Sequence, residues 1–269
     1  MKRSRRIRGA CLAAAVLLAV PALGAQFRPD EIAQRARWED FLRTAEIVRS
    51  EKDGVEAKGV WKSIDTKVDG FPDHWHGEIA AYELDKRVGL GMIPPAVERV
   101  FQGRPGALSL WAENRYSLLK VVEDNIAVPK EAVARIDDAK YLTRAWDCLI
   151  ANNDRTQQNV LYTDDWRTLL IDHSRAFLSD KAHRERLIYG ADGIKMMDDG
   201  AGGRRPALFR RLPRAFVDGV RKLDLAAVRA AAASTLTQAE MEAVMERAGK
   251  LLTEIDAMIR RDGEAKILY

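Results

Sequence analysis

The chain has 269 residues, of which 47% are hydrophobic and 31% are charged. This balance supplies enough apolar side chains for one sizeable core or two smaller lobes, and it argues against a disordered chain. The 44 basic and 40 acidic residues give a formal charge of +4, but five of the basic residues lie before Ala10. Without them the charge is −1, which leaves no general case for binding nucleic acid or a charged membrane surface.

The first 25 residues are typical of a secretory signal peptide. A basic segment is followed by an apolar run from Ala10 to Val20, by the helix-breaking Pro21 and by small residues. The apolar run is shorter than the ~20 residues that a membrane span needs. We therefore expect cleavage near Gly24 or Ala25 and a periplasmic or secreted chain without a stable membrane span. An uncleaved membrane anchor is the alternative.

The next part of the chain, to about residue 113, is predicted to be rich in strands. Its expected elements are a helix at 29–44, strands at 45–48 and 55–64, a helix at 77–89, and strands at 93–101 and 108–112. Turn residues separate the strands of each pair: Lys52-Asp53-Gly54 in the first pair, and Gly-Arg-Pro-Gly at 103–106 in the second. Gly89 is expected to end the second helix.

The remainder of the chain is predicted to be mainly helical. The expected elements are a helix at 132–151, a hairpin with strands at 160–162 and 168–171, a glycine-rich loop at 190–203, and long helices over 208–261. The fold class is thus α+β, with a signal peptide at 1–25, a mixed unit at 26–113 and a helical unit at 114–269. Cys148 is the one cysteine after the leader, and its apolar neighbours predict a buried structural thiol.

Two acids and an amide flank the predicted hairpin of the helical part. Asp154 follows the helix, Asn159 precedes the first strand, and Asp172 follows the second. A hairpin brings its two ends together, so the three side chains are expected to converge on one cleft. Phosphoryl transfer needs one carboxylate for the acceptor hydroxyl and hard oxygen ligands for Mg²⁺ or Mn²⁺. The alternative is structural, because aspartate and asparagine are common turn formers.

The residues Asn-Asp154-Arg-(x3)-Asn159, followed by Leu-Ile-Asp172-His-Ser-Arg-Ala-Phe, carry a family resemblance. This pattern resembles the atypical kinases related to phosphatidylinositol 3- and 4-kinases: the type II lipid 4-kinases, the HipA-type protein kinases and small bacterial PI3/4-kinase-like proteins. The secreted protein kinases of the animal Golgi share the design. The resemblance implies that Asp154 is the catalytic aspartate and that Asn159 and Asp172 bind the metal ion.

The upstream half of the chain extends the resemblance. Lys62 lies on a predicted strand, and Glu78 lies in Gly-Glu-Ile-Ala-Ala-Tyr at the start of a predicted helix. Kinases pair such a lysine with such a glutamate so that the lysine meets the nucleotide phosphates. The resemblance implies a two-lobed, protein-kinase-like fold with a small mixed N-lobe and a helix-rich C-lobe. Residues 110–113 would form the hinge, with Trp111 and Glu113 beside the adenine. Without the resemblance, Lys62 would be read as a solvated strand residue. Glu78 would be read as a charge at the start of a helix, where the helix dipole favours it.

The expected function is therefore transfer of phosphate from ATP, with Mg²⁺ or Mn²⁺, to a hydroxyl on a protein, lipid or small molecule. Two features favour an exported pseudokinase that binds nucleotide or a partner without turnover. Between residues 45 and 62 the only glycines are Gly54 and Gly59, which is few for a loop that covers phosphates. The leader also directs the chain away from cytoplasmic ATP. A metal-dependent phosphoester hydrolase built on the same acids is a third possibility. Separately, Asp73, His74 and His76 are expected to form either a surface loop or a small metal cluster.

Overall fold

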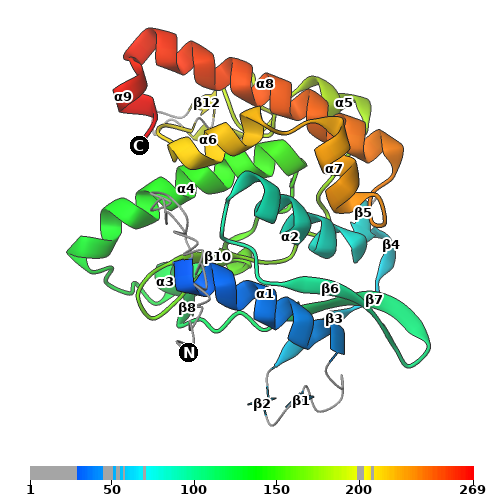
Figure 1. The fold of residues 1–269 in the computed structure, drawn as a ribbon. Helices are drawn as coiled ribbons and strands as arrows, with labels where there is room; N and C mark the ends of the chain where they lie inside the picture. The colour runs from blue at the N-terminus through cyan, green and yellow to red at the C-terminus, as the bar shows by residue number, and fades with distance from the viewer. Residues whose placement is uncertain are drawn as a thin grey trace, which may run out of the picture.

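The computed structural model describes residues 29–44, 51–52, 55–56, 58–68, 71–198, 203–206 and 209–269. The chain is α+β, with small antiparallel sheets and a helical second half (Figure 1). The predicted signal peptide and the predicted strand at 45–48 lie outside the described residues. Within the described part of the chain, no helix combines the length and the apolar character that crossing a membrane requires.

A three-stranded antiparallel sheet forms the centre of the first half. Its strands, in spatial order, are β3 (Gly59–Lys62), β7 (Arg104–Leu110) and β6 (Ala96–Phe101). Gln102 and Gly103, both with positive φ (49° and 75°), make the tight turn between β6 and β7. This conformation matches the right-handed twist of the two strands. The predicted turn at 103–106 was therefore too long, because residues 104–106 already belong to β7.

Helices cover the two faces of this sheet. On one face, α1 (Pro29–Thr44) contributes Leu42 to a small buried cluster with Val97 and Leu108. On the other face, α2 (His76–Val88) packs with Ala96 and Ala107 into the main core (Figure 1). The helix at 29–44 has the predicted bounds, and α2 differs from its prediction by one residue at each end. Gly89 adopts φ 69° after α2, as the predicted helix end requires.

Two short hairpins flank β3 in the sequence. The first joins β1 (Glu51–Lys52) to β2 (Val55–Glu56), around the predicted turn at 52–54. The second joins β4 (Asp65–Val68) to β5 (Phe71–His74), a hairpin that the sequence did not predict. β5 leads through Trp75 into α2, so this second hairpin lies directly before the helix that carries Glu78.

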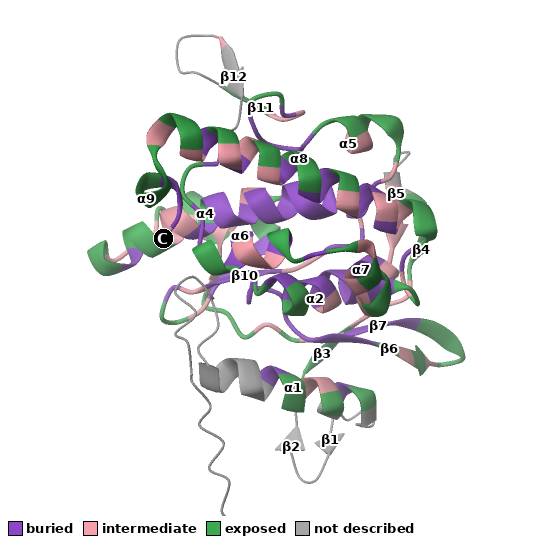
Figure 2. Cartoon of the chain, turned by 45° about the horizontal axis from the view of Figure 1, so that its top comes forward, coloured by how far each residue is buried: buried purple, intermediate pink, exposed green. Residues whose placement is uncertain are grey.

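The second half is helical and contains most of the core. Its helices are α3 (Leu118–Glu123), α4 (Lys130–Ile150), α5 (Lys181–Glu185), α6 (Arg214–Arg221), α7 (Leu225–Ala232), α8 (Gln238–Asp262) and α9 (Glu264–Ile267). The last two-and-a-half turns of α4 are buried almost without interruption, as the purple helix beneath α8 in Figure 2 shows. α8 begins with a capping box, in which Thr237 and Glu240 satisfy each other's backbone N–H groups.

The predicted hairpin of the helical part is present and gains a third strand. β9 (Val160–Tyr162) pairs with β10 (Thr168–Leu170) on one side and with β8 (Tyr116–Ser117) on the other. A single 3-10 turn, η1 (Gln157–Asn159), leads into β9. A separate short hairpin of β11 (Met196–Asp198) and β12 (Arg204–Pro206) lies in the region predicted as a glycine-rich loop.

Candidate functional site

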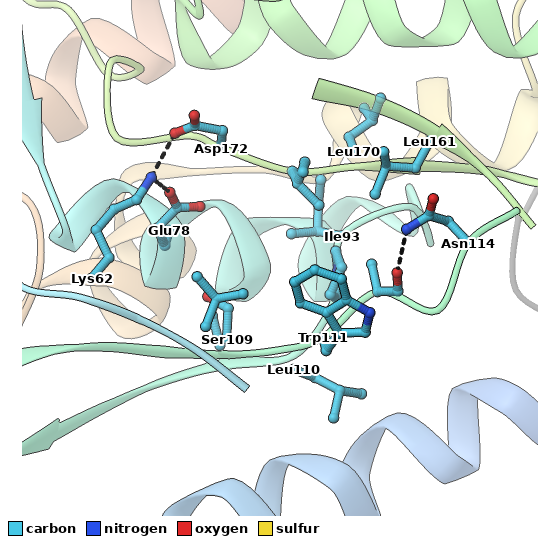
Figure 3. Close-up of a pocket in the computed structure, with 15 residues that line it drawn as sticks. Lys62, Glu78, Ile93, Ser109, Leu110, Trp111, Asn114, Leu161, Leu170 and Asp172 are labelled. Carbon is cyan, nitrogen blue, oxygen red and sulfur yellow. Dashed lines mark hydrogen bonds and ion pairs between the residues drawn. The ribbon is translucent and has the colours of Figure 1, made fainter. Parts of the chain in front are cut away.

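Three charged side chains from distant parts of the chain meet at the border of one cavity (Figure 3). Lys62, the last residue of β3, places its Nζ 2.6 Å from Oε1 of Glu78 and 2.6 Å from Oδ1 of Asp172. The Ser174 hydroxyl donates to the same Asp172 oxygen at 3.2 Å. The structure thus brings together three residues that the sequence singled out, although Lys62 and Asp172 are 110 positions apart.

Glu78 is the buried centre of this group. Burial alone would raise the pKa of its carboxyl, but hydrogen bonding from His173 and the charge of Lys62 lower that pKa to about 2. Burial of the Lys62 ammonium disfavours its charged form, yet Glu78 and Asp172 outweigh that effect, so the pKa of Lys62 is raised. At neutral pH the glutamate is therefore ionised and the lysine protonated.

The loop that carries Asp172 is held against the start of α2. The backbone N–H of His173 donates to Oε2 of Glu78 at 3.0 Å, and a Cβ added to Gly77 would lie 2.4 Å from the His173 carbonyl oxygen. Asp172 itself adopts φ 60°, a left-handed conformation that aspartate tolerates better than most residues. The close approach at Gly77 and the turn at Asp172 together aim the carboxylate at Lys62.

The cavity has apolar walls and polar ends. It has a volume of about 340 Å³ and lies between β3, the end of β7 and the β9–β10 hairpin. Most wall residues are aliphatic: Val60, Ile93, Pro94, Ala96, Leu110, Leu161, Leu170 and Ile171. Lys62, Glu78 and Asp172 close one end, while Trp111 and Asn114 border the other (Figure 3). A flat, mostly apolar ring with an anionic tail fits this distribution.

The segment predicted as the hinge borders that cavity only in part. Trp111 lines it, whereas Glu113 is exposed and lies outside the lining. The backbone N–H of Trp111 donates to the Lys58 carbonyl, and the side chain of Asn114 donates to the carbonyl of Ala112 at 2.8 Å. Asn114, which the sequence analysis did not single out, therefore replaces Glu113 as the polar side chain at this end.

The loop after α4 is fixed by a buried arginine. α4 ends at Ile150, and the capping residue Ala151 has a left-handed backbone (φ 49°). Arg155 then turns inward, 3.0 Å from the buried Asp147 of α4, and donates to the carbonyl oxygens of Asn159 at 3.2 Å and Ile171 at 2.8 Å. One guanidinium thus ties the helix, the loop and both ends of the hairpin together.

Asp154, unlike this buried anchor, has a partly exposed side chain. Its backbone N–H is held by the side chain of Asn152 at 3.0 Å. Nη1 of Arg175 lies 3.5 Å from its carboxylate, and Nε of Arg175 donates to Asp73 of β5 at 3.3 Å. Asp154 lies outside the cavity lining.

Asn159 lies beside the start of the Asp172 loop, but of the three side chains expected to converge on one cleft only Asp172 lines the cavity. The carbonyl of Asn159 accepts the Ile171 N–H at 3.2 Å, and its side-chain amide donates to the Asp154 carbonyl at 3.4 Å. Among the described residues, no group of three or more His, Cys, Asp or Glu could hold a metal ion alone. One carboxylate and one amide oxygen fit Mg²⁺ or Mn²⁺ only where water and phosphate oxygens complete the coordination shell.

Three residues of this network received no role from the sequence, namely Asp147, Arg155 and Arg175, and Asp73 was considered only with His74 and His76. Asp147 left a signal, since a carboxylate between Trp146 and Cys148 on an apolar helix face needs a buried partner. The contact of Asp73 with Arg175 left no signal in the sequence, because 102 positions separate the two residues.

The other predicted side chains have structural surroundings. His74 pairs with Asp65 across the β4–β5 hairpin, and the ring of His76 stacks on Trp75 with centroids 3.7 Å apart. This arrangement agrees with a surface segment rather than a metal cluster. Cys148 is buried, as predicted, and burial raises the pKa of its thiol to about 12.

Comparison with protein families and curated proteins identified no relative of this chain. No protein-family model matches the chain, and no curated protein is detectably similar to it in sequence.

Proposed function

We propose that this chain is a kinase that transfers a phosphoryl group from a nucleoside triphosphate to an acceptor hydroxyl. The observation that carries the proposal is the convergence of Lys62, Glu78 and Asp172 at one end of an apolar cavity. In this proposal the fold is two-lobed and kinase-like. The β3–β7–β6 sheet with α1 and α2 forms the small lobe, and residues 114–269 form the helical lobe.

The cavity would hold the nucleotide base between the aliphatic walls, with Trp111 and the backbone of 110–114 along one edge. Lys62, kept cationic by Glu78 and Asp172, would then face the phosphates. Asp172 and the side-chain oxygen of Asn159 would hold Mg²⁺ or Mn²⁺, whose charge offsets that of the phosphate oxygens when it is bound.

Asp154 would act on the acceptor. Its carboxylate is partly exposed, so it could orient the acceptor hydroxyl and receive its proton. The bond between the acceptor oxygen and phosphorus would form while the bond between phosphorus and the nucleoside diphosphate breaks. The acceptor hydroxyl would pass its proton to Asp154. Arg175, which contacts Asp154, must leave that oxygen accessible for this step.

One observation favours the alternative, an exported pseudokinase that binds nucleotide or a partner without turnover. The hairpin that would cover the phosphates is short, with two residues in each of β1 and β2. The predicted export of the chain also favours the pseudokinase, because nucleotide is scarce outside the cytoplasm.

Incubation of the chain from residue 26 with radiolabelled ATP and Mg²⁺ or Mn²⁺ tests both readings. We expect autophosphorylation or labelling of a generic acceptor, at least about 100-fold weaker in Asp172→Ala, because the metal and phosphates lose a ligand. Glu83→Gln, on the same small lobe but outside the cavity, should retain the activity. Tight ATP binding without label transfer would refute the kinase proposal and support the pseudokinase. Absence of ATP binding would refute the proposal that the cavity binds a nucleotide.

A further inference from the structure

A buried carboxylate in the last turn of α2, that of Asp85, accepts hydrogen bonds from four donors. Three of these donors are successive backbone N–H groups: those of Gly91 at 2.6 Å, Met92 at 3.1 Å and Ile93 at 2.8 Å. The fourth is Nη2 of Arg35 in α1, which lies 2.9 Å from Oδ2 of the carboxylate. Both side chains of this ion pair are buried, so each charge depends on the other for compensation.

The segment held in this way forms one wall of the candidate nucleotide cavity. Ile93 and Pro94 line the cavity, as Figure 3 shows for Ile93. The carbonyl of Ile93 accepts a second hydrogen bond from Arg35 at 2.7 Å, and the carbonyl of Met92 accepts the N–H of Leu170 in β10 at 2.9 Å. Because Pro94 has no N–H group of its own, the hydrogen bonds of the two preceding residues anchor this wall.

A second contact keeps α1 beside α2. Oε2 of Glu39 accepts the hydroxyl of Tyr82 at 3.0 Å and the ammonium of Lys86 at 2.9 Å. The guanidinium of Arg35 lies 5.0 Å from the ring centroid of the same tyrosine. Arg35 and Glu39 are four positions apart, so they share one face of α1 and both turn towards α2. None of the described side chains of α1 lines the cavity, so α1 acts on the cavity through residues 91–94.

We propose that Arg35 is a positioning residue for the cavity, which with Asp85 holds the wall at Ile93 and Pro94 where it meets the base of the nucleotide. Replacing the guanidinium with an apolar group leaves the carboxylate buried with backbone donors alone and removes a donor from the Ile93 carbonyl. The wall then moves away from the base. The inference rests on the proposed function only in naming the ligand of this wall as a nucleotide base.

The phosphate end of the cavity is held independently of Arg35. One carboxylate oxygen of Glu78 accepts from Lys62 at 2.6 Å, and the other accepts the backbone N–H of His173 at 3.0 Å. Neither contact involves α1 or the segment after α2. Loss of Arg35 should therefore affect the base more than the phosphates, which a general loosening of the fold would not do.

Amide hydrogen exchange tests the wall without any nucleotide. We expect Arg35→Met to speed exchange at residues 91–93 and at Leu170 at least about tenfold, relative to amides in the middle of α8 that report global unfolding. Arg35→Lys keeps the charge but is shorter and lacks the guanidinium fork, so its exchange should rise less, at least about threefold. Arg37→Met, the same change at an exposed position of α1, should exchange like the wild type.

Unchanged exchange at these amides in Arg35→Met would overturn the proposal. If that variant does not fold, Arg35→Lys decides the question in the same way, since it keeps a cation beside Asp85. A rise of equal size in Arg37→Met would also overturn it, because the effect would then belong to α1 as a whole.

Titration calorimetry with two separate probes, adenosine and inorganic triphosphate with Mg²⁺, tests the effect on the ligand. Arg35→Met should weaken adenosine binding about five- to tenfold and leave triphosphate binding within about twofold of the wild type. Arg37→Met should bind both probes like the wild type. Equal weakening of both probes by Arg35→Met, or of neither, would refute a specific role in positioning the wall.

The two measurements separate failure of this inference from failure of the proposed function. Faster exchange in Arg35→Met, in a chain whose wild type binds neither probe, would support the hold of Arg35 on the wall and refute the nucleotide site. Adenosine binding by the wild type, with exchange and affinity that ignore the change at Arg35, would support the nucleotide site and refute the positioning role.

Discussion

Glu78 is the residue on which the candidate site depends most, because it contacts both halves of it. One carboxylate oxygen holds the Lys62 ammonium and the other accepts the backbone N–H of the Asp172 loop. Neutralising this carboxylate would loosen the lysine and the loop together. His173, beside it, is fully buried, and burial lowers the pKa of its ring, so the imidazole is neutral and accepts a hydrogen bond from Arg155.

Acid should therefore remove the stability that Glu78 provides. The pKa of its carboxyl is about 2 in the folded chain and 4.5 in the reference state, so its contribution is complete above about pH 4.5 and declines as pH falls towards 2. The shift corresponds to about 3 kcal/mol. Urea denaturation at pH 7, 4.5 and 3 should show a gap between the wild type and Glu78→Gln that narrows with acidity.

Glu83→Gln, on a more exposed face of the same helix, is the control for that experiment. Its difference from the wild type should stay small at every pH, since Glu83 pairs with the partly exposed Lys86. A gap for Glu78→Gln that is equally large at pH 3 and pH 7 would contradict the assigned pKa.

At the scale of elements, the sequence predicted those parts in which local pattern and burial agree. The apolar spacing of 29–44 and 77–89 gave helices whose bounds match the structure to within a residue. The β4–β5 hairpin was missed because Asp65–Val68 is polar and Pro72 interrupts the next strand; proline is tolerated there since the sheet has only two strands.

The candidate site divides in the same way. Asp154, Asn159 and Asp172 could be predicted because turn chemistry places them at the ends of one local hairpin. The link of Arg175 to Asp73 depends on how distant elements pack, which no local pattern encodes.

The contact between α2 and the Asp172 loop leads to a prediction about two glycines. Gly77→Ala would place a methyl group 2.4 Å from the His173 carbonyl, so α2 or the loop must move. We expect a loss of about 2–4 kcal/mol in unfolding free energy and a much larger loss of ATP binding, because Glu78 and Asp172 separate. Thermal denaturation and nucleotide titration measure the two effects.

Gly249→Ala provides the matched control for that pair. Gly249 lies within α8, and an added Cβ meets nothing within 4 Å. The variant should be more stable by about 0.5–1 kcal/mol through helix propensity, with unchanged nucleotide binding. Destabilisation by both substitutions, or by neither, would show that the close approach at Gly77 is not a constraint.

Across the whole molecule, one buried cation joins the long helix α8 to the candidate site. Arg247 of α8 donates to the Leu149 carbonyl at 2.9 Å and to the Leu178 carbonyl at 2.7 Å. These carbonyls belong to the last turn of α4 and to the segment just after the Asp172 loop, so α8 holds the chain on both sides of the site. Burial lowers the pKa of the guanidinium to about 10, and it stays charged at neutral pH.

Arg247→Met should therefore affect stability and nucleotide binding together. The variant keeps a long side chain in the core but leaves two buried carbonyls without their donor, which costs about 2–4 kcal/mol in unfolding free energy. The loops on either side of Asp154 and Asp172 then lose their common anchor, so ATP affinity should fall even at temperatures where the variant is folded. Lys250→Met, on an exposed position of the same helix, should change neither quantity. A stable Arg247→Met with unchanged ATP affinity would mean that the site is organised by the small lobe and the Arg155 network alone, without α8.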